Sequence, residues 1–144
     1  MCIRDSGNTF VVPDFGTGAA IRLEQDEGGH VIVDNILVNH GGGPSISLGD
    51  APFTSDYNAL VDVFAIDEGD VDVGAWQGAG HDVHSIVVDG TGLFVGPADF
   101  HLVDGAAPID AGIDAQGGVA ASAIDLDGAT RPQGAGYDIG AYER

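Results

Sequence analysis

The chain has 144 residues and a mass of 14.6 kDa, which suffices for one domain with its own core but hardly for two. Its 23 acidic residues face four arginines and no lysine, and the net charge of −19 argues against nucleic acid or an anionic membrane surface as a partner. Val and Ile together number 26 against seven Leu, and 24 residues are Gly, so the composition predicts a turn-rich, all-β protein. No stretch approaches the roughly 18 consecutive apolar residues of a membrane span.

The first six residues (MCIRDS) match nothing later in the chain and lack the pattern of a β-strand. They resemble the conceptual translation of a transposase-end sequencing adapter, so we treat residues 1–6 as an adapter artefact and expect the native sequence to begin near Gly7. Cys2 is the only cysteine of the chain. The native part therefore offers no disulfide, no thiolate metal ligand and no cysteine nucleophile.

Residues 7–62 contain a repeat of about 25 residues. Two series of segments recur at offsets of 27, 23 and 25 residues: 8–12 with 35–39 and 58–62, and 20–23 with 45–48. Each period holds two short apolar-alternating segments between Gly-rich turns, which predicts the stacked coils of a right-handed parallel β-helix. A β-sandwich would instead show turns about every 8–12 residues, without register between distant segments.

Alternation along these strands predicts which side chains point into the solenoid. We expect aliphatic stacks inside it, built from Ile21, Leu23, Ile36, Val38, Ile46 and Leu48. Asn8, Asn35 and Asn58 recur at the head of the same strand. Stacked Asn side chains form amide ladders, so these three residues are predicted to be a structural ladder.

The repeat fades in residues 63–104. This part contains an acidic turn at 67–72, a segment around Trp76 with a short helical turn, and three closing strand-like runs at 85–88, 93–95 and 99–103. Because an open solenoid end exposes unpaired strand edges, we expect this region to cover the end of the stack.

Two later segments resemble known families. Residues 93–112 resemble the closing coils of bacterial right-handed parallel β-helix proteins of the pectin-lyase-like superfamily. Residues 125–143 (DLDGATRPQGAGYDIGAYE) are similar to the C-terminal signature of the choice-of-anchor Q domain, which occurs on secreted or surface β-helix proteins. The resemblance implies that residues 105–144 are a C-terminal cap motif and that the protein is secreted or on the cell surface. Because the first six residues resemble a sequencing adapter, we expect that the signal peptide was lost by truncation.

The cap motif contains one useful cation. Arg131 stands in the sequence amid Asp125, Asp127 and Asp138, with Asp110 shortly before them. A bidentate guanidinium–carboxylate pair is expected to pin the cap, which is a role in stability and not in catalysis.

The pectin-lyase-like superfamily includes lyases and hydrolases of acidic polysaccharides, so catalysis has to be weighed. Its lyases use carboxylate-bound Ca²⁺ with an Arg or Lys as base, and the coils of this chain offer only Arg22, which is expected to point outward. Its hydrolases use Asp side chains from adjacent coils, for which Asp34, Asp56 and Asp62 are candidates. Chance proximity among 19 aspartates explains such a group equally well.

Three acidic or His-containing stretches are candidate metal sites. His81 and His84, with the Asp82 carboxylate between them, are side chains of the kind that bind Zn²⁺. The sequence shows no further protein ligand that would complete such a site. Asp67, Asp70 and Asp72 resemble part of a Ca²⁺ loop without completing one. The pair Asp125 and Asp127 does so too, and bound Ca²⁺ at either place would be structural. No other cofactor is indicated.

We therefore expect a non-catalytic C-terminal β-helix segment and cap of a secreted or surface-attached bacterial protein associated with polysaccharide. One alternative is a fragment of a Ca²⁺-dependent polysaccharide lyase or a glycoside hydrolase whose catalytic coils lie upstream. Another is a surface adhesin or structural protein. The open strand edge of the first coil also predicts that the chain self-associates.

Overall fold

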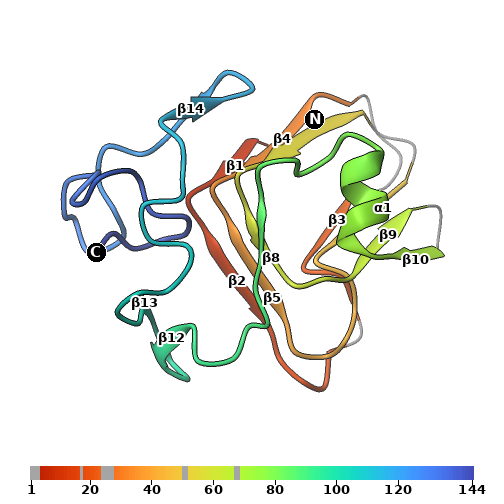
Figure 1. Ribbon diagram of the computed structural model, residues 1–144, viewed down its shortest axis with the longest axis horizontal. Helices are drawn as coiled ribbons and strands as arrows, with labels where there is room; N and C mark the ends of the chain where they lie inside the picture. Colours follow the sequence, from red (N-terminus) through yellow and green to blue (C-terminus); the bar gives the residue numbers. More distant parts are fainter. Residues whose placement is uncertain (1–3, 17, 24–27, 50–51, 67–68) are drawn as a thin grey trace.

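The computed structural model describes residues 4–16, 18–23, 28–49, 52–66 and 69–144. Its first half is a parallel β-solenoid of about three turns, and the C-terminal segment lies along one side of that solenoid (Figure 1). Apart from one short helix, the described regular structure is all β, as the composition predicts. No helix in the described ranges has the length and apolar character needed to cross a bilayer.

Three sheets, named here after their first strands, form the walls of the solenoid. All their pairings are parallel except that of β10 with β9. The β1 sheet contains β1 (Arg4–Ser6), β4 (His30–Val33) and β7 (Phe53–Asp56); the β2 sheet contains β2 (Thr9–Val12), β5 (Ile36–Asn39), β8 (Ala59–Leu60) and β11 (Ile86–Val87); the β3 sheet contains β3 (Ile21–Leu23), β6 (Ile46–Leu48), β9 (Phe64–Ile66) and β10 (Gly69–Val71).

The remaining elements follow the solenoid in the chain. Helix α1 (Val73–Gly78) includes Trp76, where a short helical turn was predicted. Two antiparallel hairpins come after it: β12 (Phe94–Gly96) with β13 (Asp99–Leu102), and β14 (Ala115–Gln116) with β15 (Val119–Ala120). The three predicted closing runs thus coincide with β11, β12 and β13.

The repeat offsets predicted the strand register in two of the sheets. Thr9 pairs with Ile36, which pairs with Ala59, and Ile21 pairs with Ile46, as the alignment of the repeats requires. Each coil, however, has three strands and not the two that the sequence pattern suggested. In each coil, the strand that the sequence did not predict is the one that belongs to the β1 sheet. The first of these strands is Arg4–Ser6, a segment that was expected to form no strand.

The interior of the solenoid is an apolar cluster in which the side chains of all three sheets meet. Its buried members are Leu23, Ile32, Leu37, Ile46, Leu60, Phe64 and Trp76. Ile21 and Leu48 pack against it, so Ile21, Leu23, Ile46 and Leu48 lie inside as predicted. Each fully buried side chain of this size contributes about 1.5–3 kcal/mol of transfer free energy.

The expected inward orientation of Ile36 and Val38 is wrong. Both residues lie on the outer face of the β2 sheet, in a second cluster with Leu93, Leu102 and Ile139 from the C-terminal half. Because side chains alternate along a strand, Leu37 takes the inward position between them. The central strands of the β2 sheet, β5 and β8, are therefore buried on both faces, which is why β5 lacks the polar alternation of a surface strand.

Helix α1 covers one end of the interior. The indole of Trp76 is fully buried and stacks on the Phe64 ring, with the ring centroids 4.8 Å apart. Asp72 begins the helix, and its side chain accepts a hydrogen bond from the Ala75 amide at 2.9 Å. The predicted cover for the end of the stack is thus supplied by residues from 63–104.

Residues 105–144 lie beside the stack and not over its end (Figure 1). The Gly140 amide donates to the Asp34 carbonyl at 2.8 Å, and the Ala141 amide donates to the Thr9 hydroxyl at 3.2 Å. Gly140 has a φ of 112°, and a Cβ there would lie 2.7 Å from the Ile36 Cδ1. Only glycine fits where this segment touches the outer face of the β2 sheet.

At the opposite end of the stack, β1, β2 and β3 are each the outermost strand of their sheet. Unpaired strand edges are templates for pairing with other chains. The self-association predicted from the sequence remains a prediction about this end of the solenoid.

The corner between the β1 and β2 sheets has a repeated backbone conformation. Gly7, Asp34 and Tyr57 occupy equivalent places and have left-handed φ angles of 66°, 57° and 55°. Each of them directly precedes an Asn. The left-handed residue turns the chain, and the Asn side chain then bonds the backbone that the turn leaves unpaired.

The three Asn residues stack across successive coils. The backbone N–H of Asn8 donates to the Asn35 Oδ1 at 3.0 Å, and the backbone N–H of Asn35 donates to the Asn58 Oδ1 at 2.9 Å. The next rung is Ser85, whose hydroxyl oxygen accepts from the Asn58 amide at 2.8 Å. Asn35 also donates from its Nδ2 to the Val33 carbonyl of its own coil at 3.0 Å. Together with its bonds to Asn8 and Asn58, this makes Asn35 join three levels of the stack at the corner.

We predict that Asn35→Ala lowers the free energy of unfolding by about 2–4 kcal/mol, because it leaves several buried backbone groups without partners. Asn8→Ala is the matched control, since Asn8 is only half-buried and stands at the end of the row. Its loss should be about 1 kcal/mol. Urea unfolding followed by circular dichroism measures both values, and equal losses would show that the middle rung has no special weight.

Candidate functional site

Arg131 is buried at the centre of the C-terminal segment and organises the backbone around it. Its Nε donates to Glu143 Oε2 at 2.6 Å, its Nη1 donates to the Gly140 carbonyl at 3.2 Å, and its Nη2 donates to the Asp138 carbonyl. The carboxylate partner is thus Glu143, and the expected bidentate pair with an aspartate is absent from the contacts of this side chain.

The aspartates of the predicted cap bind main-chain amides. Asp125 accepts from the Ala129 and Glu143 amides at 2.7 and 3.0 Å. Asp138 Oδ1 accepts from the Asp110 amide at 2.7 Å, and Asp110 Oδ1 accepts from the Gly136 amide at 2.8 Å. Burial raises the pKa of Asp138, whose Oδ2 has no hydrogen-bond partner among the described residues. These carboxylates stabilise turns and do not form an open site.

Asp127, the remaining cap residue, lies at the surface beside β13. The His101 ring contacts two carboxylates, with Nδ1 2.6 Å from Asp99 and Nε2 2.8 Å from Asp127. Hydrogen bonds to Asp99 and then to Asp127 raise the pKa of His101, because both partners favour the imidazolium. The ring also packs on Tyr142 at a centroid distance of 4.0 Å, so His101 joins the hairpin to the C-terminal segment.

The proposed Zn²⁺ ligands point in different directions. The His81 ring stacks on Phe53 with centroids 4.5 Å apart, and burial lowers its pKa. Asp82 is fully buried, where its carboxylate accepts from Asn58 Nδ2 at 2.9 Å and from the Trp76 indole at 2.8 Å. His84 instead contacts Asp56 and stacks on Tyr57, so the three residues of the motif have separate partners and do not converge on one point.

The acidic stretch likewise forms no loop of converging oxygens in the part that can be described. Asp70 lies on β10 and Asp72 begins α1, while Asp67 is outside the described residues. The described ranges contain no group of three His, Cys, Asp or Glu side chains placed to hold a metal ion.

The three candidate catalytic aspartates have separate partners. Asp34 Oδ1 accepts from the Ile113 amide at 2.9 Å, and burial raises the pKa of this carboxyl to about 6. Asp62 accepts from the Val73 amide at 2.6 Å, at the start of α1. Arg22 is exposed on β3, as expected. Asp34 and Asp62 serve as turn and helix contacts, which leaves Asp56 as the one with a side-chain base beside it.

Asp56 pairs with His84 at the surface. The Asp56 carboxylate lies 2.7 Å from the His84 Nδ1 and also accepts from the His84 amide at 2.7 Å. The imidazole is 59% exposed and stacks on Tyr57 at a centroid distance of 5.0 Å. A carboxylate at Nδ1 orients a histidine so that its other nitrogen faces solvent, the arrangement of a general base. Asp56 and His84 were predicted to belong to two different candidate sites, and their pairing was not predicted, although the two residues are about one period apart.

A cavity of about 580 Å³ lies between the β12–β13 hairpin and the end of β2. Its wall includes Val11, Pro13, Asp14, His40, Phe94 and Phe100. The two Phe rings meet edge to face at 5.4 Å, and both are half-buried. Ligand pockets of about 300–1,000 Å³ with mostly apolar walls and a few polar groups are typical of small-molecule sites. No sequence motif predicted this cavity, because residues that are far apart in the sequence form its wall.

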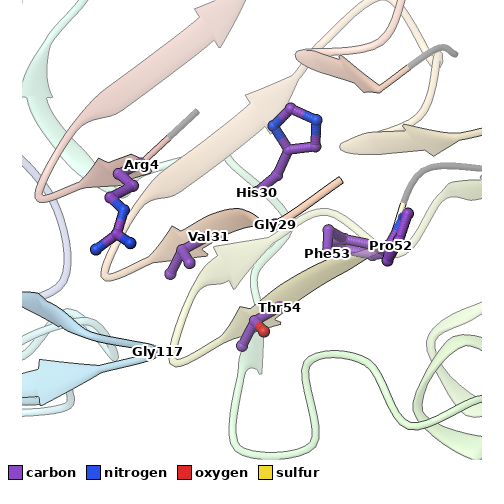
Figure 2. A pocket seen from close by; sticks show the side chains of 8 residues that line it. All are labelled: Arg4, Gly29, His30, Val31, Pro52, Phe53, Thr54 and Gly117. Atoms are coloured by element: carbon purple, nitrogen blue, oxygen red, sulfur yellow. The ribbon is translucent and has the colours of Figure 1, made fainter. Parts of the chain in front are cut away.

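A second pocket of about 270 Å³ lies on the outer side of the β1 sheet (Figure 2). Arg4 and Val31 border it opposite the turn at Gly117, and the Arg4 guanidinium donates to the Gly118 carbonyl at 3.0 Å. Figure 2 shows the His30 ring pointing away from Arg4 and Val31. Since Arg4 belongs to the segment predicted to derive from a sequencing adapter, we assign this pocket no binding role.

A scan against protein-family models, a search of curated proteins and a search of solved structures each found no match to this chain. The resemblance to pectin-lyase-like and choice-of-anchor Q proteins is therefore a hypothesis about this protein. What the contacts of the described residues offer independently is a tightly bonded C-terminal segment, the Asp56–His84 pair with its exposed imidazole, and an aromatic cavity.

We predict that Arg131→Met lowers the free energy of unfolding by about 3–5 kcal/mol, because it leaves the buried Glu143 carboxylate without its cation. Arg144→Met is the control, since that guanidinium pairs with the exposed Asp104 at the surface and should cost less than about 1 kcal/mol. Differential scanning calorimetry of both variants tests this. Similar melting temperatures for the two variants would contradict the structural role of Arg131.

Proposed function

We propose that this chain is a non-catalytic closing segment of a parallel β-helix protein of the pectin-lyase-like class, with a C-terminal segment of the choice-of-anchor Q type. In this proposal the parent protein is bacterial, is secreted or attached to the cell surface, and associates with polysaccharide. The chain contributes a stable scaffold that ends the helix and presents its side faces to the glycan.

The observation that carries the scaffold role is the use of the polar residues. Asp82, Asp125 and Glu143 are buried, and each accepts hydrogen bonds that hold one backbone segment against another. Buried charged groups are costly unless they are fully paired. A segment that commits its buried carboxylates to such contacts is built for a fixed shape, which suits a scaffold better than a reacting centre.

The association with polysaccharide is supported by the aromatic cavity beside the β12–β13 hairpin. Aromatic and apolar walls with a few polar groups fit the mixed faces of a sugar ring. The net charge of −19 disfavours uronate polymers unless a cation bridges the two negative surfaces. Neutral or cationic glycans are therefore the favoured class.

One observation favours the enzyme alternative, in which the chain belongs to a polysaccharide lyase or glycoside hydrolase. The exposed His84 ring, oriented by Asp56, is placed to move a proton. A second catalytic group within reach of His84 is not identified among the described residues. The adhesin alternative needs no glycan contact at all.

The test is a binding and turnover assay on a panel of immobilised polysaccharides: a neutral glucan, chitosan, and polygalacturonate with Ca²⁺. We expect retention on the glucan or chitosan, with no release of reducing ends or unsaturated product from any polymer. Product formation that His84→Ala abolishes would replace the scaffold proposal by the enzyme alternative. Absence of retention on every polymer would remove the polysaccharide from the proposal and leave the adhesin alternative.

A further inference from the structure

The cavity beside the β12–β13 hairpin, defined by its wall residues above, has a chemical character that narrows its ligand. Two rings, Phe94 and Phe100, form one side, and Val11 and Pro13 add aliphatic surface from the end of β2. An aromatic wall of this kind packs against C–H groups and attracts cations through the ring faces.

The polar groups of the cavity are Asp14 and His40. Both residues are exposed, and no described residue bonds the Asp14 carboxylate or the His40 ring, in contrast to the buried carboxylates of the C-terminal segment. An exposed carboxylate beside aromatic rings is complementary to a positively charged ligand group. The two groups are thus available to a ligand.

The net charge of the whole chain also favours a positively charged ligand. With a net charge of −19, the protein raises the local concentration of cations and lowers that of anions. Two of the four arginines, Arg131 and Arg144, are engaged with Glu143 and Asp104. An anionic ligand would therefore meet repulsion at long range and the Asp14 carboxylate at close range.

We propose that this cavity binds a pyranose ring that carries a free ammonium group, that is, an amino-sugar unit of a polysaccharide. The ammonium group pairs with Asp14, the C–H face of the ring packs on Phe94 and Phe100, and His40 is available to a ring hydroxyl. This inference rests on the proposed association with polysaccharide and adds to it both a place and a ligand class.

The experiment is isothermal titration calorimetry of the full chain with glucosamine oligomers at pH 5.5, where most of the amines are charged. The matched ligand is the N-acetylglucosamine oligomer of the same length, which has the same ring without the charge. Butylammonium, which carries the charge without the ring, is the third ligand. The protein variants are Asp14→Asn and Phe100→Leu, and Asp70→Asn is a control that removes the same charge from an exposed position on β10.

We expect the glucosamine oligomer to bind more tightly than either other ligand. Asp14→Asn should weaken this binding roughly threefold to fivefold, as the loss of a surface ion pair does. Phe100→Leu, which keeps apolar volume and so spares the fold, should weaken it about threefold through the lost ring face. Asp70→Asn should leave the affinity unchanged within error.

Three results would overturn the inference. If the N-acetylated oligomer bound as tightly as the glucosamine oligomer, the ammonium group would not be what the cavity recognises. If butylammonium bound as tightly, the pyranose ring would not be what it recognises. Glucosamine binding that Asp14→Asn and Phe100→Leu leave intact would place the contact elsewhere, and the proposed association with polysaccharide would survive. Failure of the proposed function itself is recognised separately, by the absence of retention on every polymer of the panel.

Discussion

The burial of β5 and β8, the central strands of the β2 sheet, on both faces is the constraint on which the rest of this structure depends. Its inner face, represented by Leu37 and Leu60, joins the solenoid interior, and its outer face, with Ile36 and Val38, meets the C-terminal half. A sheet covered on one side only would leave a broad apolar face in water, which proteins avoid. The C-terminal segment therefore lies beside the stack, because there it covers the apolar outer face of the β2 sheet. The corner row of Asn8, Asn35 and Asn58 fixes the coil register that presents this surface.

Much of the solenoid could be predicted from the sequence, because stacked coils place equivalent residues at repeating offsets. The alignment of Asn8, Asn35 and Asn58 gave the register of the β2 sheet, and that of Ile21 with Ile46 gave the β3 sheet. The β1 sheet was missed since its strands share no apolar pattern: β4 is apolar, whereas β1 and β7 are largely polar. A usable signal was the left-handed corner position, which holds a Gly, an Asp and a Tyr directly before the three Asn residues.

The orientation of Ile36 and Val38 could not be predicted from alternation alone. Alternation separates a strand into two sets of side chains, but it says which set faces inward only when the other set is polar. In β5 both sets are apolar except for Asn39, so the choice depends on what covers the outer face. The same reasoning applies to the candidate sites, because the partner of Arg131 and the wall of the aromatic cavity come from residues that only the tertiary fold brings together.

Two kinds of polar group thus coexist in this molecule. Asp82, Asp125 and Glu143 are buried, and each accepts hydrogen bonds that hold one part of the chain against another. Asp14 and His40 border an aromatic cavity at the surface and have no described partner. The separation explains how one small, strongly acidic domain combines a fixed scaffold with a place for a ligand of opposite charge.

Native-state hydrogen exchange tests most directly whether the solenoid and the C-terminal segment are one cooperative unit. The informative amides are those of Ile36 and Ala59, which bond across the coils, and those of Ile113 and Gly140, which bond the C-terminal segment to Asp34. If both faces of the β2 sheet are required, the two pairs of amides open with the same free energy to within about 1 kcal/mol. Exchange of Ile113 and Gly140 through an opening several kcal/mol less costly, with the coils still protected, would contradict this account.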